Sequence, residues 1–308
     1  MNIIGKRYLF FALSLLIILP GLVLIGSWAI QKDLPLSVDF TGGSQLEVRF
    51  EGGNPQPADI VRLYSDLQVG DVQVQTTDQD TLVIKSAFID NDQRDLILSG
   101  MESEFGSPPT VLRLESVGPS IGSQVTSRAA IAVAIAALAV VLFITVTFRG
   151  IQHAFRYGVC AIIAMLHDVA VVFSAAALGH LIFGWEMDAL FLTALLTVIG
   201  FSVQDKIVVF DRIRENATVL RRLDFETLVN HSIIQTLQRS INTQLMTVEF
   251  LLLALALMGG VTLQEFCIIL FVGLLSGTYS SIFIAAPILV LWEKQEWKTW
   301  FHRKEATA

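Results

Sequence analysis

Charged residues are scarce in this chain of 308 residues. Asp, Glu, Lys and Arg together make up 16% of the sequence, whereas apolar residues make up 53%. Soluble proteins contain about 25% charged residues, so this composition excludes an ordinary soluble protein as a description of the whole chain. The net charge of −7 says little about partners, because the basic residues are sorted to one set of helix ends.

Enzyme signatures are missing from the most polar stretch of the sequence, residues 37–118. This stretch contains no metal-ligand spacing, no phosphate-binding loop and no pair of residues typical of a nucleophile and its base. We therefore expect it to contact another polypeptide. We expect the chain to be neither an enzyme nor a binder of a cofactor, a metal or nucleic acid.

Long apolar runs are what the sequence has in place of charge. Each is about 20 residues or longer, which is enough to cross a hydrocarbon core of roughly 30 Å. They are residues 8–30, 129–148, 157–183, 189–210, 240–259 and 266–292. The sequence therefore predicts a multi-pass α-helical membrane protein with six transmembrane helices.

The first run is expected to be a retained anchor. Lys6 and Arg7 give it the positive start of a signal peptide. Its apolar stretch is much longer than the h-region of about 7–15 residues that such peptides contain, and no cleavage site stands out at its end. We therefore favour a first transmembrane helix over a cleaved leader.

The positions of Lys and Arg predict the orientation of the chain. The short loops 184–188 and 259–265 contain neither residue, and the basic residues collect at the opposite ends of the helices. These residues are Lys6, Arg7, Arg149, Arg156, Arg212, Arg214, Arg221, Arg222, Arg239, Lys294, Lys298, Arg303 and Lys304. We expect both termini in the cytoplasm and residues 37–127 outside.

The expected division of the chain follows from these observations. It comprises an N-terminal tail with the first helix (1–36), an extracytoplasmic domain (37–127), helices two to six (128–293) with a cytoplasmic link at 211–238, and a cytoplasmic tail (294–308). The only cysteines, Cys160 and Cys267, would lie at opposite membrane depths, which excludes a disulfide between them. Both are expected to be buried packing residues.

The polar domain alternates strand and helix patterns. Strands are predicted at 44–50, 71–77, 81–89 and 110–117, with DQD at 78–80 as a hairpin turn. A helix should follow Pro57, and another should begin at Asp90 or Asn91 and end near Gly106. The order βαββαβ is typical of an α+β ferredoxin-like fold. VDFTGG at 38–43 is expected to be a Gly-Gly turn leading into the first strand.

Several polar residues lie inside the apolar runs, where ionisable groups are costly and usually functional. Ser202, Asp205 and Arg212 share one helix face. A second stripe is formed by Arg239, Asn242, Thr243, Met246 and Glu249. Depth places Asp205 near Arg239, so the two are expected to form an ion pair. This pair fits an ion pathway or a static fastening between helices equally well.

Two further features of the helices need explanation. His167 and Asp168 lie near the middle of the third run, and an isolated His-Asp pair in a membrane helix is a poor metal site. Gly273, Gly277, Ser281 and Ala285 recur at i+4 spacing in the sixth run, which predicts that another helix packs closely there. The segment 224–238 has the apolar spacing of a helix lying along the membrane interface.

These motifs together resemble the SecF family, in which each protein is the smaller partner of SecD in bacterial protein export. The matching segments, in order, are VDFTGG, VGPSIG, LHDVAVVF, GFSVQDKIVVFDRIREN and SIIQTLQRSINTQ. The resemblance covers nearly the whole chain and extends to the resistance-nodulation-division superfamily. It implies pairing with SecD, and association with the SecYEG channel, its SecA motor and often YajC. It also implies export of unfolded preproteins across the bacterial inner membrane, driven by the proton-motive force.

The resemblance also implies roles for particular residues. Asp205 and Arg239 match the family's proton pathway, and Asp168, Asn242 and Thr243 are further candidates. The coupling ion is expected to be H⁺, although intramembrane carboxylates also bind Na⁺. The family usually has a small polar residue where this chain has Lys206, whose ammonium either snorkels to the cytoplasmic edge or turns inward and holds Asp205 ionised.

Two other functions compete with this one. A non-conducting assembly subunit of the translocon would use the same charges only to fasten helices. Half of a small-molecule exporter would need a larger outer region and a second half. Glu249 is given no role by the resemblance.

Overall fold

The computed structural model describes residues 2–31, 34–51, 53–77, 81–147, 149, 154–249, 252–253, 255, 257 and 261–295. Several predicted features lie outside these residues: the turn 78–80, part of the fifth apolar run and its loop at 258–260, and Lys298, Arg303 and Lys304. The chain forms two units, Leu36–Ile131 and the combination of Met1–Pro35 with Ala132–Ala308. Each is described by itself.

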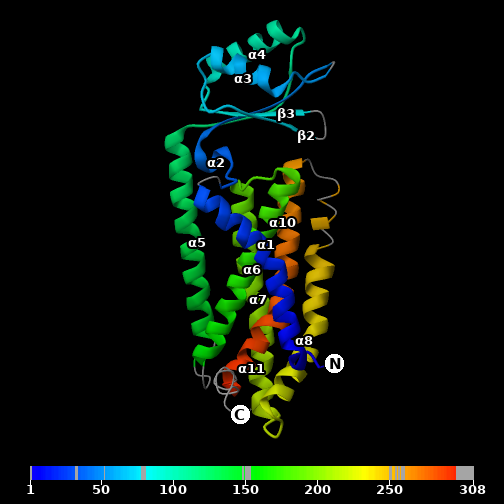
Figure 1. The fold of residues 1–308 in the computed structure, drawn as a ribbon. Coiled ribbons are helices and arrows are strands. Elements are labelled where there is room, and N and C mark those ends of the chain that lie inside the picture. Colours follow the sequence, from blue (N-terminus) through cyan, green and yellow to red (C-terminus); the bar gives the residue numbers. More distant parts are fainter. Residues whose placement is uncertain are drawn as a thin grey trace, which may run out of the picture. The chain divides into compact units, whose positions relative to one another are not determined.

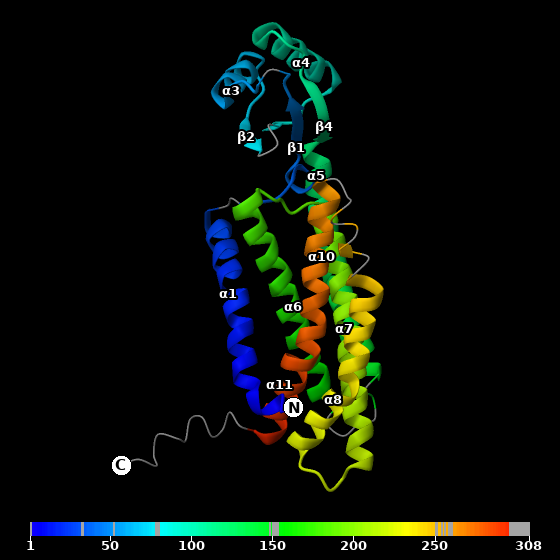
Figure 2. The ribbon, with the colours of Figure 1, turned by 90° about the vertical axis from the view of Figure 1, so that its right-hand side faces the viewer.

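The smaller unit is a four-stranded antiparallel sheet with two helices on one face (Figures 1 and 2). Its elements are α2 (Val38–Thr41), β1 (Gly43–Arg49), α3 (Pro57–Asp66), β2 (Gln73–Thr77), β3 (Thr81–Ser86), α4 (Asn91–Phe105) and β4 (Thr110–Val117). The strand order is β2-β3-β1-β4, and neighbouring strands are antiparallel. The predicted order of strands and helices is therefore present.

Local signals set the ends of the helices in this unit. Asp90 is the N-cap of α4 and accepts a hydrogen bond from the Gln93 N–H at 2.8 Å. The Gln93 side chain in turn accepts the Asp90 N–H, which completes a capping box. The helix ends at Gly106, whose φ of 74° is left-handed. Both ends agree with the sequence prediction.

The Gly-Gly motif differs in part from the expected simple turn. Residues 38–41 form a helical turn, α2, and β1 begins at Gly43. Gly42 and Gly43 have φ values of 73° and 118°, which disfavour any residue with a side chain. A Cβ on Gly122 would lie 2.5 Å from the Gly42 nitrogen, so the backbone of α5 (Pro119–Thr147) passes directly against this motif.

The core of the smaller unit lies between the sheet and the two helices. Its fully covered residues include Leu46, Ile60, Tyr64, Leu82, Ile84, Ile97 and Met101. Tyr64 is the polar member of this group. Burial raises the pKa of its hydroxyl, which has no hydrogen-bond partner among the described residues.

Replacing Tyr64 by phenylalanine is expected to stabilise the smaller unit by about 1 kcal/mol, because a buried unpaired hydroxyl costs about 1–3 kcal/mol. Thermal unfolding of the full chain would measure the change. Tyr279→Phe is the matched control, since the Tyr279 hydroxyl donates to the Phe10 carbonyl at 2.9 Å. That substitution should destabilise the chain, and a loss of stability in Tyr64→Phe would contradict the assignment.

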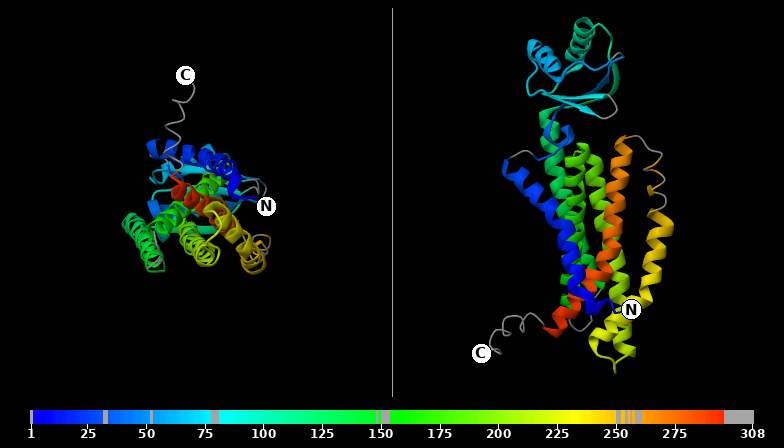
Figure 3. Two further views of the ribbon diagram at one scale, coloured as in Figure 1. Left: turned by 90° about the horizontal axis from the view of Figure 1, so that it is seen from below. Right: turned by 45° about the vertical axis from the view of Figure 1, so that its right-hand side comes forward.

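The larger unit is a bundle of long helices (Figures 1 and 3). They are α1 (Arg7–Gln31, after the 3₁₀ turn Ile4–Lys6), the lower part of α5 (Pro119–Thr147), α6 (Ala154–Phe183), α7 (Ala189–Val219), α8 (Phe225–Thr243), α10 (Val261–Ser280) and α11 (Ala286–Lys294). Two π-helical segments, Gln244–Glu249 and Ser281–Ala285, follow α8 and α10. Helix α5 starts at Pro119, ahead of its apolar run, because the run marks only the part expected in hydrocarbon.

Five helical segments among the described residues are long and apolar enough to cross a membrane. They are Ile4–Gln31, Pro119–Thr147, Phe155–Phe183, Ala189–Val219 and Leu263–Lys294. We compared how much of the most apolar stretch of each segment is buried inside the protein. The buried share is 61% in Leu263–Lys294, 50% in α6 and 44% in α7, but only 17% in α1 and 6% in α5. Helices α6, α7 and α10 therefore form the centre of the bundle, and both cysteines are buried and free there.

The segment between the fourth and fifth apolar runs differs in part from its prediction. Helix α7 runs unbroken through the charged residues 211–216 to Val219. Residues 224–238, expected to lie along the interface, belong to a helix that begins at Phe225 and extends to Thr243. Asp224 caps α8 by accepting the Thr227 N–H at 3.2 Å. Helix α8 then continues directly into the π-helical segment Gln244–Glu249. The apolar spacing of 224–238 therefore reflects packing against α7, not a surface helix.

Charges tie three helix ends together near the N-terminus. The Glu226 carboxylate accepts hydrogen bonds from Arg7 at 3.2 Å and from Lys294. Lys294, and to a smaller extent Arg7, hold the pKa of Glu226 below its ordinary value. Asn230 adds a third contact, because its side-chain oxygen accepts the Ile3 N–H at 2.8 Å. The start of α1, the start of α8 and the end of α11 are thus joined.

Candidate functional site: two buried carboxylates

Asp168 of α6 lies at the centre of the bundle and is 1% exposed. Its Oδ2 atom accepts hydrogen bonds from Lys206 Nζ at 2.7 Å, Ser202 Oγ at 2.6 Å and Ser280 Oγ at 2.6 Å. Its Oδ1 atom accepts the Ser276 hydroxyl at 2.7 Å. The carboxylate therefore has polar partners on both oxygens, supplied by α7 and α10. A charged carboxylate this deeply buried is stable only with such compensation.

Lys206 is the ionic partner of Asp168 and is completely buried. Besides the bond to Asp168, its ammonium donates to the Ser202 backbone carbonyl at 3.2 Å and to the Ser202 hydroxyl. A lysine ammonium has three donors, so all three are used. The prediction that it snorkels to the cytoplasmic edge is wrong. The alternative was right that it turns inward, but wrong about the carboxylate, which is Asp168 and not Asp205.

His167 completes the surroundings of Asp168. Its Nδ1 atom lies 3.1 Å from Asp168 Oδ1, and its ring stacks on Tyr279 with centroids 6.1 Å apart. Among the described residues, no group of three or more His, Cys, Asp or Glu side chains is placed to hold a metal ion. The His-Asp pair therefore contributes to a hydrogen-bonded cluster.

Asp205 of α7 is the second buried carboxylate, and it is 9% exposed. Its Oδ1 atom accepts the Ser240 hydroxyl and its Oδ2 atom accepts the Ser281 hydroxyl, both at 2.9 Å. These serines come from α8 and from the π-helical segment after α10. Asp205 forms no ion pair within the part of the chain that the structure describes. Its hydrogen-bond partners are thus neutral hydroxyls, in contrast to those of Asp168.

The predicted ion pair between Asp205 and Arg239 is absent. Arg239 is exposed, and its neighbour Ser240 faces Asp205. Adjacent residues of an α-helix point about 100° apart, so the two cannot face one carboxylate in the same helix orientation. Depth along the membrane placed Arg239 correctly near Asp205, but it did not specify which side of α8 faces α7.

Arg239 instead lines a groove of about 570 Å³ between α5, α7 and α8. The rest of its lining is mostly apolar: Ala139, Val140, Phe143, Gly200, Val203, Gln204, Ile207 and Val208. Asn242 and Thr243 are also exposed, so neither joins the two carboxylate clusters. The expected polar stripe on α8 is present from Arg239 to Thr243, and it lies on the exposed side of the helix.

Glu249 does not continue that stripe. It is 2% exposed, and neither carboxylate oxygen has a hydrogen-bond partner among the described residues. The backbone is π-helical from Gln244 to Glu249, and this wider winding rotates later residues away from the α-helical register. The stripe inferred from α-helical spacing therefore ends where the winding changes.

Small residues bring α10 against α7. A Cβ atom on Gly273 would overlap Val198 Cγ2 and lie 2.9 Å from Val172 Cγ2. One on Gly277 would lie 3.3 Å from the Ser202 Cα. Ser281, which follows at the same spacing, is fully buried and reaches Asp205. The stripe is thus both a packing surface and the support for the hydroxyls of the site.

The π-helical segment Ser281–Ala285 has an identifiable cause. Pro287 lies in the first turn of α11 and has no N–H to donate to the carbonyl of Phe283. A local π-turn accommodates this missing bond, and such turns are frequent at functional sites. At the start of this segment, the consecutive residues Ser280 and Ser281 donate to different carboxylates, Asp168 and Asp205.

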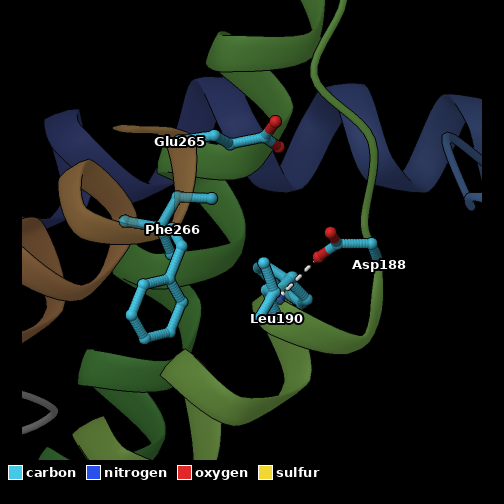
Figure 4. Close-up of a pocket in the computed structure, with 6 residues that line it drawn as sticks. Asp188, Leu190, Glu265 and Phe266 are labelled. Atoms are coloured by element: carbon cyan, nitrogen blue, oxygen red, sulfur yellow. Dashed lines mark hydrogen bonds between the residues drawn. The ribbon is translucent and has the colours of Figure 1, made fainter. Parts of the chain in front are cut away.

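A narrow recess lies between the start of α7 and α10, far along the helix from these carboxylates (Figure 4). Asp188 caps α7 there by accepting the Phe191 N–H at 2.7 Å. Leu190, Glu265, Phe266 and Ile269 complete the lining. The recess is too narrow to hold a water molecule, so it serves helix capping and packing and is no ligand site.

Two family models match the chain. Residues 100–295 match the model described as "Protein export membrane protein SecD/SecF, C-terminal", and residues 33–53 match the "SecD/SecF GG Motif". The first match includes both carboxylate clusters. The second includes Gly42 and Gly43, both of which have positive φ.

Individual proteins are similar over the full chain. "Protein translocase subunit SecF" of Anaerolinea thermophila is 62% identical over 98% of this chain and 97% of its own length. The protein of the same name from Thermobaculum terrenum is 42% identical over 100% and 98%. The crystal structure of SecDF, "a translocon-associated membrane protein", from Thermus thermophilus superposes with a TM-score of 0.80 at 32% identity. It covers 96% of this chain, and this chain spans 39% of that longer one.

Proposed function

Because the chain belongs to the SecD/SecF family of protein export membrane proteins, we propose that it serves protein export by using the proton-motive force. It is a transport component, and we assign it no enzymatic reaction. In this proposal Asp205 binds and releases the proton, and a change in helix packing passes the energy to the outer unit. The substrate is an unfolded preprotein moving outward across the bacterial inner membrane.

The observation that carries the proposal is the contrast between the two carboxylates. Asp168 has a buried ammonium at 2.7 Å, whereas Asp205 is held only by the hydroxyls of Ser240 and Ser281. A fully compensated carboxylate gains little by taking a proton, since it would lose its ion pair. Asp205 can take up a proton without losing an ion pair. A serine hydroxyl donates to an ionised carboxylate and can accept from a protonated one, so both partners can remain bound.

Arg239 supplies a second arrangement for the same site. It precedes Ser240 in α8, so a rotation of this helix by about 100° would bring the guanidinium to Asp205 in place of the serine. An ionised Asp205 favours the arginine, and a protonated Asp205 favours the hydroxyl. Each charge that crosses the membrane supplies about 2.3 kcal/mol per 100 mV, which is enough to bias such a two-state change.

SecD is the proposed main partner. Arg239, Asn242, Thr243 and Gln204 are exposed on one side of the bundle, and polar groups at membrane depth need a polar or protein environment. The longer SecDF relative, of which this chain spans 39%, supports pairing with a second half. Association with SecYEG, SecA and YajC, and contact with the lipid bilayer, complete the proposed assembly.

We extend the proposal to the topology. Six transmembrane helices are proposed: the five apolar helices described above and the apolar run 240–259, which is the fifth in chain order. Both termini are placed in the cytoplasm. The strand order β2-β3-β1-β4 supports a ferredoxin-like assignment for the outer domain at 37–127. The remaining divisions of the chain follow the sequence prediction.

The test is Asp205→Asn, which keeps the shape of the side chain and removes its ability to titrate. We expect export into inverted membrane vesicles to lose its dependence on the proton gradient, while co-purification with SecD is unchanged. Asp205→Glu is the matched control and should retain part of the dependence. A subunit that only fastens helices would instead lose its association with SecD and keep gradient-dependent export. Recovery of a drug-transport activity would favour the small-molecule exporter.

A further inference from the structure

The ammonium of Lys206 donates hydrogen bonds to three oxygen atoms. They are one carboxylate oxygen of Asp168, the backbone carbonyl of Ser202 and the hydroxyl of Ser202. The Ser280 hydroxyl is bound to the same carboxylate oxygen at 2.6 Å. A carboxylate, a carbonyl and hydroxyls are the ligands that hard metal cations take in proteins. The surroundings of the ammonium are therefore those of a cation site.

The site is closed to solvent. Lys206 is 0% exposed and Asp168 is 1% exposed, so bulk water does not screen either charge. The negative charge of Asp168 must then be balanced from within the protein. The backbone carbonyl of Ser202 also takes part, as carbonyls do in the ion sites of membrane transporters.

We propose that Lys206 is a tethered cation that occupies a monovalent-cation cage formed by Asp168, Ser202 and Ser280. The four-carbon stem fixes the positive charge in α7, so the cage exchanges no free ion. Asp168 is thereby removed from ion coupling, and Asp205 is left as the group that responds. Without the ammonium, the oxygen atoms of the cage would carry an uncompensated negative charge. The space left by the lysine side chain would lie beside them, and this arrangement suits a partly dehydrated Na⁺.

This inference does not depend on the proton role proposed for Asp205, because its test involves neither export nor a gradient. The full chain is purified in detergent, and thermal unfolding is followed in NaCl, KCl and choline chloride at equal ionic strength. The wild type should unfold at the same temperature in all three salts. Lys206→Ala should be less stable in choline chloride, and NaCl should raise its midpoint by about 5 °C or more in a saturable way.

Two variants separate cation binding from general effects of salt. Asp168→Asn with Lys206→Met has a neutral cage filled by the thioether chain, so its unfolding should not depend on the cation. Lys206→Ser adds a hydroxyl to the emptied cage and should respond to NaCl as Lys206→Ala does. If Lys206→Ala can be recovered folded only in NaCl, that result also supports the proposal.

Three outcomes would overturn the inference. Lys206→Ala and Lys206→Ser could unfold at one temperature in all three salts. The wild type could respond to NaCl as strongly as they do. Both variants could also fail to fold in every salt while the neutral double variant folds, which would mean that a free cation cannot replace the ammonium.

Discussion

Asp168→Asn is expected to destabilise the chain by about 3–5 kcal/mol, because it leaves the Lys206 ammonium buried without its counter-charge. The same change replaces a carboxylate oxygen by an NH₂ group that cannot accept hydrogen bonds from the surrounding serines. The bundle centre would thus lose its ion pair and at least one of the serine contacts that join α6 to α7 and α10. Denaturant titration of the full chain in detergent, followed by helical circular dichroism, measures this loss.

Two controls make this prediction specific. Adding Lys206→Met to Asp168→Asn should recover most of the stability, because a neutral pair of similar volume does not leave an unpaired charge buried. Asp205→Asn should cost only about 1 kcal/mol, since Asp205 is bonded to two hydroxyls and to no cation. Equal losses for Asp168→Asn and Asp205→Asn would show that the buried ion pair does not hold the bundle together.

Features with a local cause were predictable from the sequence. The capping box at Asp90 and the left-handed Gly106 bound α4 where the sequence placed its ends. Alternation of apolar residues identified the strands, and run length identified the five apolar helices that the structure describes. These signals depend on residues close together in the chain, so no knowledge of the tertiary arrangement was needed.

The partner of each carboxylate was not predictable in the same way. Helical spacing indicates which residues share a face, but it leaves open which neighbouring helix that face meets. Lys206 was weighed against Asp205, its neighbour in sequence, although its partner Asp168 is on α6. One usable signal was overlooked: Ser276 and Ser280 recur at i+4 on α10, and both donate to Asp168.

A π-helical segment explains the remaining error. The stripe ending in Glu249 was drawn with α-helical spacing, whereas the small-residue series ending in Ala285 is buried at all four positions. The winding changes at Gln244 and again at Ser281, so residues beyond these points have a different phase. Pro287 signals the second change, but no residue type in the described part of the first segment marks the other one.

Gly273→Leu is expected to disrupt the contact between α10 and its two neighbours in the bundle centre. Even the first side-chain atom would overlap Val198 on α7 and lie 2.9 Å from Val172 on α6. Overpacking of a tight core costs about 1–3 kcal/mol and occasionally more. The cost should be at the upper end here, because moving α10 away also lengthens the bonds from Ser276 and Ser280 to Asp168.

Gly200→Leu is the matched control for this prediction. Gly200 lies in α7, and a Cβ atom there would meet no other atom within 4 Å. Because leucine favours a helix more than glycine by up to about 1 kcal/mol, Gly200→Leu should leave the stability of the isolated chain unchanged or slightly raised. Thermal unfolding of both variants in detergent gives the comparison. If Gly273→Leu unfolded at the same temperature as Gly200→Leu, the close approach of α10 to α7 would not be a requirement of the fold.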